Sequence, residues 1–179
     1  MTEITEDDFK RAMGAFPSGV TVITTRLPDG VDVGMTASAF ASVSLEPPLV
    51  LVCVQNRLDM CDFITTASSF GVSILTADQT AISNRFAGGF IDDHGRWQPW
   101  PEHRDKFEDL EVFRLEPAGC ALLNGSSVGL QCTLEHAYAG GDHTIFVGRV
   151  TALKGLADDT QMPLVYAQGR YARLDTSPK

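Results

Sequence analysis

The pattern of apolar and polar residues predicts one amphipathic helix near the start of the chain. Apolar residues recur there at the three- and four-residue spacing of a helical face, at Phe9, Ala12, Met13 and Phe16. Thr5 followed by Asp8 provides an N-cap for this helix. Pro17 and Gly19 end it.

Beyond Gly19 the pattern becomes that of strands. β-Branched and apolar residues predict strands over residues 20–25, 31–37, 49–54, 70–75, 118–123, 129–138 and 144–153. Short helices are predicted over residues 58–67 and from a cap at Asp78 to Phe86. Residues 88–109, rich in Gly, Pro, Asp and His, are expected to form a long surface loop. Six or seven strands with few helices favour one mainly β domain over residues 1–179, a closed or nearly closed barrel, because closure removes exposed sheet edges.

Charge and cysteine content narrow the classes of function. A formal net charge of -9 over 179 residues argues against binding nucleic acid or an anionic membrane through a basic face. The acidic N-terminus has no signal-peptide pattern, and no run approaches the roughly 20 apolar residues of a membrane span. The four cysteines, Cys53, Cys61, Cys120 and Cys132, form no C-x-x-C pair. We therefore expect buried free thiols in a reducing cytoplasm, not disulfides or a metal site.

Several familiar catalytic patterns are absent or lie in the wrong context. Residues 125–129 match G-x-S-x-G, but a nucleophile elbow needs a helix after the serine, and here strand-like sequence lies on both sides. The four histidines, His94, His103, His136 and His143, show no metal-ligand spacing. Neither a P-loop nor a strand–GxGxxG–helix unit is present. A hydrolase, a metal centre and a Rossmann site are therefore not predicted.

Two segments carry candidate chemistry. Residues 34–48 combine small side chains and hydroxyls, so a planar ligand could lie against their main chain. The alternative is a Ser/Ala-rich strand crossing. Residues 83–87, Ser-Asn-Arg-Phe-Ala, join a hydroxyl, a guanidinium and an aromatic ring at a helix end, a combination that can hold a phosphate. The alternative for this segment is a solvated helix end.

These segments, with their order and flanks, resemble the short-chain flavin reductase family, the reductase components of two-component flavin monooxygenases. The resemblance covers almost the whole chain. It is carried by residues 16–25, 34–40, 42–48, 141–148 and 163–166, followed by Gly169-Arg170-Tyr171. It implies a Greek-key split β-barrel with a few short helices that forms a homodimer, with flavin at the subunit interface.

The resemblance also implies roles for individual residues. Residues 35–38 and 42–44 would line the isoalloxazine and ribityl chain, and residues 53–57 the ribityl and phosphate region. Ser83, Arg85 and Phe86 would hold the phosphate or adenine end. His143, the one implied catalytic residue, would lie near the nicotinamide, with Arg170 and Tyr171 close by; the alternative for His143 is a packed or solvated hairpin histidine. The implied cofactor-binding residues are Met35, Thr36, Ala37, Ser38, Ser42, Val43, Ser44, Cys53, Gln55, Asn56, Arg57, Ser83, Arg85, Phe86, Arg170 and Tyr171.

The implied activity is reduction of FAD or FMN by NADH or NADPH, with NADH and FAD favoured. The hydride passes once the two rings stack, so positioning dominates and no strong base is needed. Reduced flavin would then leave for a separate monooxygenase. Two rival interpretations remain at this stage. One is a non-catalytic flavin- or haem-binding split barrel, and the other is an oxygenase that keeps its flavin.

Overall fold

The computed structural model describes residues 4–155 and 161–174, which form three helices and fourteen strands. The helices are α1 (Glu6–Gly14), α2 (Met60–Ala67) and α3 (Thr80–Phe86). The strands are β1 (Ser18–Gly19), β2 (Thr21–Arg26), β3 (Asp32–Ala37), β4 (Phe40–Leu45), β5 (Pro48–Gln55), β6 (Ser69–Ile74), β7 (Gly89–Ile91), β8 (Trp97–Pro99), β9 (Val112–Phe113), β10 (Leu122–Leu123), β11 (Val128–Gly140), β12 (His143–Lys154), β13 (Val165–Ala167) and β14 (Arg170–Ala172). None of the helices in the described ranges is long and apolar enough to cross a membrane.

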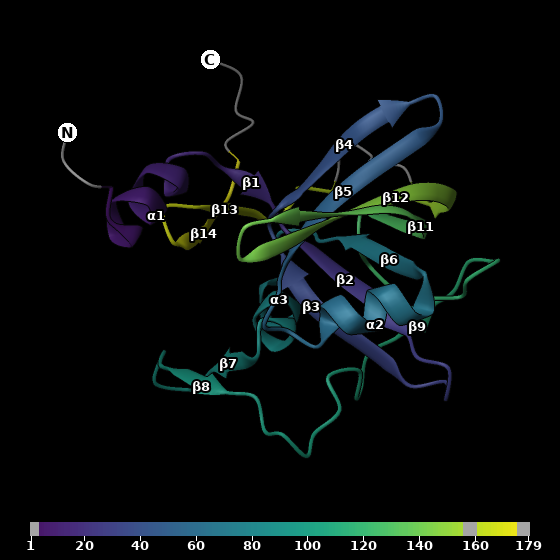
Figure 1. Ribbon diagram of the computed structural model, residues 1–179. Coiled ribbons are helices and arrows are strands. Elements are labelled where there is room, and N and C mark those ends of the chain that lie inside the picture. Colours follow the sequence, from purple (N-terminus) through teal and green to yellow (C-terminus); the bar gives the residue numbers. More distant parts are fainter. Residues whose placement is uncertain (1–3, 156–160, 175–179) are drawn as a thin grey trace.

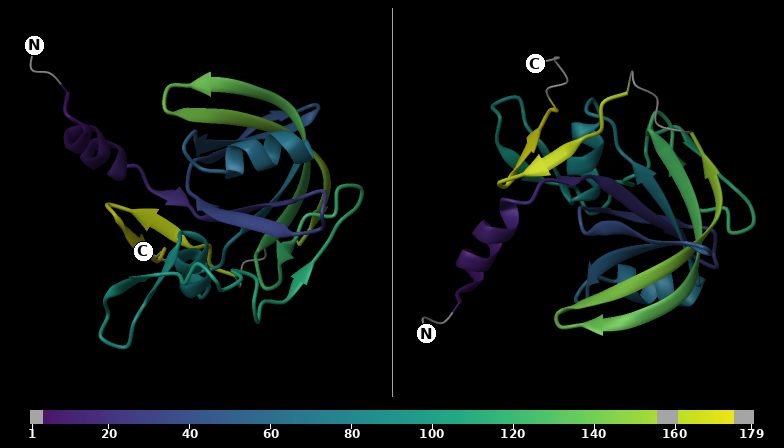
Figure 2. Two further views of the ribbon diagram at one scale, coloured as in Figure 1. Left: turned by 60° about the horizontal axis from the view of Figure 1, so that its bottom comes forward. Right: turned by 90° about the horizontal axis from the view of Figure 1, so that it is seen from above.

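Seven strands form the main sheet in the order β3-β2-β6-β11-β12-β5-β4, each antiparallel to its neighbours. The sheet curls, and α2 lies across its concave side (Figures 1 and 2). The enclosed core includes Ile23, Val52, Ile64, Phe70 and Phe146, none of them more than 1% exposed. Burial of these side chains holds α2 in the curve of the sheet.

The curl of the main sheet depends on a glycine, Gly148, at a crowded position in β12. A Cβ on Gly148 in β12 would come within 2.4 Å of the Phe70 ring, which lies on the strand two places away in the sheet. Register shifts in β11, between Gln131 and Cys132 and between Leu134 and His136, add local twist to the same region. The long β11–β12 hairpin can therefore bend across the core instead of remaining flat.

The expected closed or nearly closed barrel is wrong, because the described sheets are open. Strands β3 and β4 are the two edges of the main sheet and pair with β2 and β5 only. The chain passes between them through Ser38 and Ala39, and the Ala39 carbonyl accepts a hydrogen bond from the Cys53 main-chain N–H (3.0 Å). The edges thus meet at one corner, and β4 then follows β5 away from the body (Figure 1).

A smaller core lies against the other face of β2. Val22, Leu75, Phe86, Leu123 and Leu164 are buried there to 2% exposure or less. This core joins α3 to the C-terminal part of the chain, where β1, β13 and β14 form a separate sheet. The first strand, β1, is therefore paired with β13, and β13 is paired in turn with β14.

Most predicted elements are present, with three local differences. Asp78 is not the helix cap: α3 begins after Gln79, and Asp78 instead accepts a hydrogen bond from Thr76 Oγ1 (2.5 Å). The strand expected over residues 118–123 is reduced to Leu122–Leu123. The surface segment 88–109 contains the β7–β8 hairpin. Of the four cysteines, Cys120 and Cys132 are buried, whereas Cys53 and Cys61 are only partly buried; all four are free thiols.

Candidate functional site

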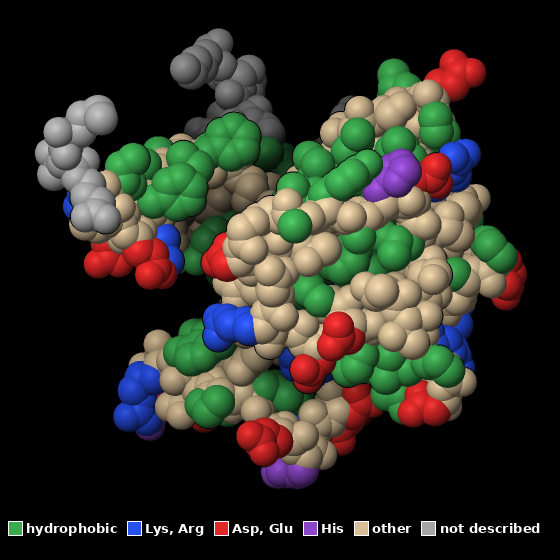
Figure 3. Space-filling model, in the orientation of Figure 1, with side chains coloured by type: hydrophobic (Ala, Val, Ile, Leu, Met, Phe, Trp, Pro, Cys, Tyr) green, Lys and Arg blue, Asp and Glu red, His purple; other side chains and the backbone are tan. Residues whose placement is uncertain are grey.

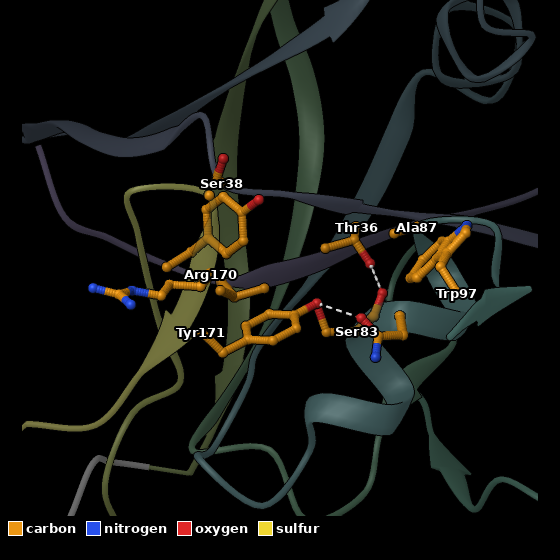
Figure 4. Close-up of a pocket in the computed structure, with 11 residues that line it drawn as sticks. Thr36, Ser38, Ser83, Ala87, Trp97, Arg170 and Tyr171 are labelled. Carbon is orange, nitrogen blue, oxygen red and sulfur yellow. Dashed lines mark hydrogen bonds between the residues drawn. The ribbon is translucent and has the colours of Figure 1, made fainter. Parts of the chain in front are cut away.

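A cleft of about 370 Å³ opens between β3, α3, the β7–β8 hairpin and the C-terminal hairpin (Figure 4). It is lined by Val20, Thr36, Ser38, Ser83, Asn84, Ala87, Trp97, Tyr166, Gly169, Arg170 and Tyr171. These lining residues include one cation and no carboxylate, although the chain has 23 acidic residues. The cleft is therefore a place where this acidic protein can accept an anion.

Hydrogen bonds between three segments of the chain fix the middle of the cleft. The Tyr171 hydroxyl lies 2.8 Å from Ser83 Oγ and 2.9 Å from Asn84 Oδ1. Thr36 Oγ1 donates to the Ser83 main-chain carbonyl at 2.6 Å (Figure 4). Burial raises the pKa of the Tyr171 phenol, so the phenol keeps its proton and remains a donor. The network ties β3, α3 and β14 together.

Strand alternation decides which β3 side chains face the cleft. Thr36 and Ser38 line it, whereas Met35 and Ala37 pack against the main core. The sequence suggested that a planar ligand could lie against the main chain along the whole of residues 34–48. In the structure these residues instead form two strands, β3 and β4, and the corner between them. Because β3 is an edge strand, the main-chain groups on its outer side are not used by the sheet.

A second hollow, of about 790 Å³, lies between α1 and the end of the β11–β12 hairpin. It is lined by Glu6, Phe9, Lys10, Gln55, Asn56, Arg57, Asp142 and His143. His143 Nδ1 is 2.7 Å from Asp142 Oδ1, and this contact lowers the pKa of the Asp142 carboxyl. The Asn56 side chain donates to the Gly141 carbonyl (3.1 Å) and accepts from Thr144 Oγ1 (2.8 Å), so it is fixed beside the histidine.

The corner at Ser38 and Ala39 lies between residues that line the two hollows. Ser38 lines the cleft, and the next residue, Ala39, is hydrogen-bonded through its carbonyl to the main chain of Cys53. Gln55, two residues beyond Cys53 on β5, lines the second hollow. Cys53 is partly buried, and burial raises the pKa of its thiol. An elongated ligand could therefore extend from one hollow past the corner into the other.

Comparisons with known proteins agree on one family. The family model "Flavin reductase like domain" matches residues 13–175. An NADH-dependent FAD reductase from Streptomyces globisporus is 38% identical over 165 residues, covering 92% of this chain and 83% of the relative. The reductase subunit of a flavin-dependent monooxygenase from Rhodococcus jostii is 34% identical over 167 residues, covering 93% of this chain and 77% of the relative. The chain belongs to the flavin reductase family.

A solved structure of the same family extends the likeness to the whole fold. The NADH:FAD oxidoreductase of Streptomyces globisporus, in complex with NAD and FAD fragments, aligns with a TM-score of 0.83 and 31% identity, covering 100% of both chains. The cleft residues of the present flavin reductase fit ligands of the nucleotide class. The cleft has an aromatic lining, an open strand edge, hydroxyls and a cation, the features that bind a flat anionic nucleotide.

Twelve of the predicted site residues of this flavin reductase fall into three groups. Thr36, Ser38, Ser83, Arg170 and Tyr171 line the cleft. Gln55, Asn56, Arg57 and His143 line the second hollow. Ser42, Val43 and Ser44 lie on β4, which extends away from both, and Val43 is 49% exposed. The single chain therefore does not bring the β4 residues to the cleft.

Arg85 and Phe86, predicted to hold the phosphate or adenine end, do not line the cleft. Arg85 Nη1 donates to the Glu108 carbonyl (2.7 Å), and its guanidinium lies 4.7 Å from the centre of the Trp100 ring. Phe86 is 1% exposed and packs in the smaller core below Gly34. Both side chains are engaged by the protein, so in this structure they support the cleft wall and do not face a ligand.

Sequence reasoning missed Trp97, Asn84 and Tyr166 as cleft residues. Trp97 and Tyr166 lie in segments with no helical or strand periodicity long enough to place them. Asn84 is within the predicted segment 83–87, but only the contact with Tyr171 shows its function. A tryptophan in a polar loop was the one available signal, because such a residue is seldom left exposed without a partner. In the described residues, no group of three or more His, Cys, Asp or Glu side chains could hold a metal ion.

Replacing Tyr171 by Phe should loosen the cleft without removing its apolar packing. The Tyr171 hydroxyl is then missing as a hydrogen-bond partner of the buried Ser83 hydroxyl and the Asn84 side-chain oxygen, so we expect the free energy of unfolding to fall by about 1–2 kcal/mol in urea titration. Tyr166→Phe is the control, because the described residues supply no hydrogen bond to that hydroxyl; it should change stability by less than about 0.5 kcal/mol. Equal losses in the two variants would contradict the assigned network.

Proposed function

We propose that this chain is an NADH-dependent flavin reductase that reduces FAD or FMN and releases the reduced flavin to a separate monooxygenase. One observation carries the proposal: a carboxylate-free cleft beside the edge strand β3 and a second hollow that contains His143 are lined by residues on the two sides of the corner at Ser38 and Ala39. One ligand can occupy the cleft while a second approaches from the hollow. This is the arrangement that a transfer between two bound nucleotides requires.

The chain's own residues contribute by binding and orienting. Flavin and nicotinamide, when bound, supply the hydride chemistry themselves. The outer main-chain groups of β3, with the Thr36 and Ser38 hydroxyls, would hold the edge of a flat ring. Arg170 would neutralise phosphate charge. The Tyr171–Ser83 contact would keep the cleft at the width of one ring system.

His143 would orient the nicotinamide carboxamide from the second hollow. Its Nδ1 is directed to Asp142, so Nε2 is the ring atom available to a ligand. Asn56, held by Gly141 and Thr144, would act beside it. No side chain in either hollow needs to serve as a base, because hydride transfer between stacked rings requires none.

We further propose that two chains associate as a split-barrel homodimer. Helix α1 has no buried residue, and Phe9, Met13 and Phe16 are 58%, 55% and 77% exposed. This apolar face stands away from the body (Figure 3). On β4, Leu45 is 95% exposed. A partner chain would cover both surfaces, and it could carry the β4 residues 42–44 to a cleft that they do not reach within one chain.

The free thiols and acidic composition support a cytoplasmic location. The similarity to a reductase subunit of a monooxygenase supports a separate oxygenase as the consumer of reduced flavin. The non-catalytic flavin- or haem-binding alternative does not account for the second hollow with its histidine beside the corner. The same similarity to a reductase subunit argues against the self-sufficient oxygenase alternative.

The proposed activity predicts a specific steady-state pattern. Purified protein should oxidise NADH when FAD or FMN is added, with a lower KM for NADH than for NADPH. A panel of two nicotinamides against FAD, FMN and riboflavin, followed in the nicotinamide absorbance band, measures this. If absorbance stays constant in every combination while flavin or haem binds, the protein is a carrier and not a reductase.

Replacing His143 by Ala should raise the KM for NADH by roughly 3- to 10-fold, the loss of about one hydrogen bond. The KM for flavin should change less than twofold. His136→Ala on the same hairpin is the control, because His136 stacks on Tyr138 (ring centroids 5.6 Å apart) and lines neither hollow. An unchanged NADH KM in the His143 variant would leave that residue a structural part of the turn.

The homodimer proposal predicts a mass of twice 19.4 kDa in sedimentation equilibrium. Phe16→Glu should shift the species toward a single chain, because a charge would be buried in the interface. Asp7→Lys, on the polar side of α1, should leave the mass unchanged. A wild-type protein that sediments as one chain at tens of micromolar would contradict the proposal.

A further inference from the structure

Trp97 is a large aromatic side chain held half-exposed at the mouth of the cleft. Its indole is 49% exposed and lines the cleft from the β7–β8 hairpin. The ring packs on the main chain at Gly89, where a Cβ would come within 2.4 Å of Trp97 Cζ2. One side of the indole is therefore supported by protein, and the rest of the ring is open to the cleft.

The turn beyond Trp97 is held rigid by one carboxylate. Asp92 accepts hydrogen bonds from the main-chain N–H groups of His94 and Arg96, both at 2.9 Å, and from the Gln98 side chain at 3.0 Å. These contacts lower the pKa of the Asp92 carboxyl, so it stays charged. The hairpin thus presents Trp97 in a fixed position, which lowers the entropy lost when a flat group stacks on it.

The two ends of the cleft differ in chemistry. Trp97 lies at one end, and Ser38 and Arg170 lie at the other (Figure 4). Ser38 leads through the corner to the second hollow and His143. A dinucleotide whose reactive ring lies at the corner would therefore place its phosphates beside Arg170 and its other ring toward Trp97.

We propose that the cleft takes an adenosine diphosphate group, with the adenine stacked on Trp97 and the phosphates near Arg170. Both FAD and NADH carry this group. The inference rests on the proposed function and deepens it, because it assigns one binding subsite and a specificity-determining residue. An enzyme that uses Trp97 in this way binds the dinucleotide more tightly than the corresponding mononucleotide.

The chain has only two tryptophans, which allows a direct binding test with ADP alone. Titration with ADP should change the tryptophan fluorescence of the wild type and of Trp100→Phe. The change should be lost in Trp97→Phe, because the reporting ring is gone. Trp100 is a suitable control because it is packed between the guanidinium groups of Arg85 and Arg104, 4.7 and 5.0 Å from the ring centre. A fluorescence change that persists in Trp97→Phe, or no change at millimolar ADP, would overturn the assignment.

A kinetic test identifies which nucleotide supplies the group. Trp97→Leu keeps apolar packing on Gly89 but removes the aromatic face. If FAD places its adenosine diphosphate here, this variant raises the KM for FAD by about 5- to 100-fold, the range expected for one base–aromatic stack, and leaves the KM for FMN within twofold. If NADH does so, only the KM for NADH rises. Phe90→Leu on the neighbouring strand is the matched control.

Two outcomes would contradict the kinetic form of the proposal. Equal rises for FAD and FMN would mean that Trp97 contacts the part that the two flavins share. No rise for any of the three nucleotides would mean that the indole binds none of them. Both outcomes differ from failure of the proposed function, in which the wild type itself oxidises no NADH. The fluorescence titration would still report on the subsite in that case.

Discussion

The Phe70 ring lies where β12 has no side chain, and this contact sets the shape of the whole molecule. With Gly148 at that point, the ring fills the inside of a curled sheet; any larger residue would force the ring or the strand to move. Curling brings both sheet edges, β3 and β4, to the corner at Ser38 and Ala39. The open main chain of the cleft and the connection to the second hollow both follow from that geometry.

The sequence predicted the elements whose patterns are long and continuous. The strands around Val22, Val52 and Val72 and the helix around Ile64 lie within a residue or two of their expected positions, because β-branched runs and helical spacing are local properties. Closure of the barrel is not local. It depends on whether β3 and β4 run side by side, and the β4–β5 pairing takes β4 away from β3. The cap predicted at Asp78 is absent for a local reason: its carboxylate accepts a hydrogen bond from Thr76, two residues earlier, and α3 begins after Gln79.

In the candidate site, too, local features could be predicted from the sequence and contacts between distant residues could not. The residue types of the corner and of Ser83 were apparent from composition, and the two hollows contain nine of the predicted residues. The position of Arg85 could not be predicted, because its partners in the structure, Trp100 and the Glu108 carbonyl, are 15 and 23 residues away along the chain. Phe86 reads as a surface aromatic in sequence, but Gly34 provides space for its ring in the core. Such contacts are properties of the tertiary structure.

Pairing of β1 with β13 has a consequence for the order in which the protein can mature during synthesis. Domains generally begin to fold from the N-terminal side as the chain emerges, and the curled main sheet needs nothing beyond Lys154. The cleft wall, in contrast, also needs Tyr166, Arg170 and Tyr171, which follow that sheet along the chain. A nascent chain can therefore have folded its main sheet and still lack one wall of its cleft until the segment through Tyr171 has left the ribosome.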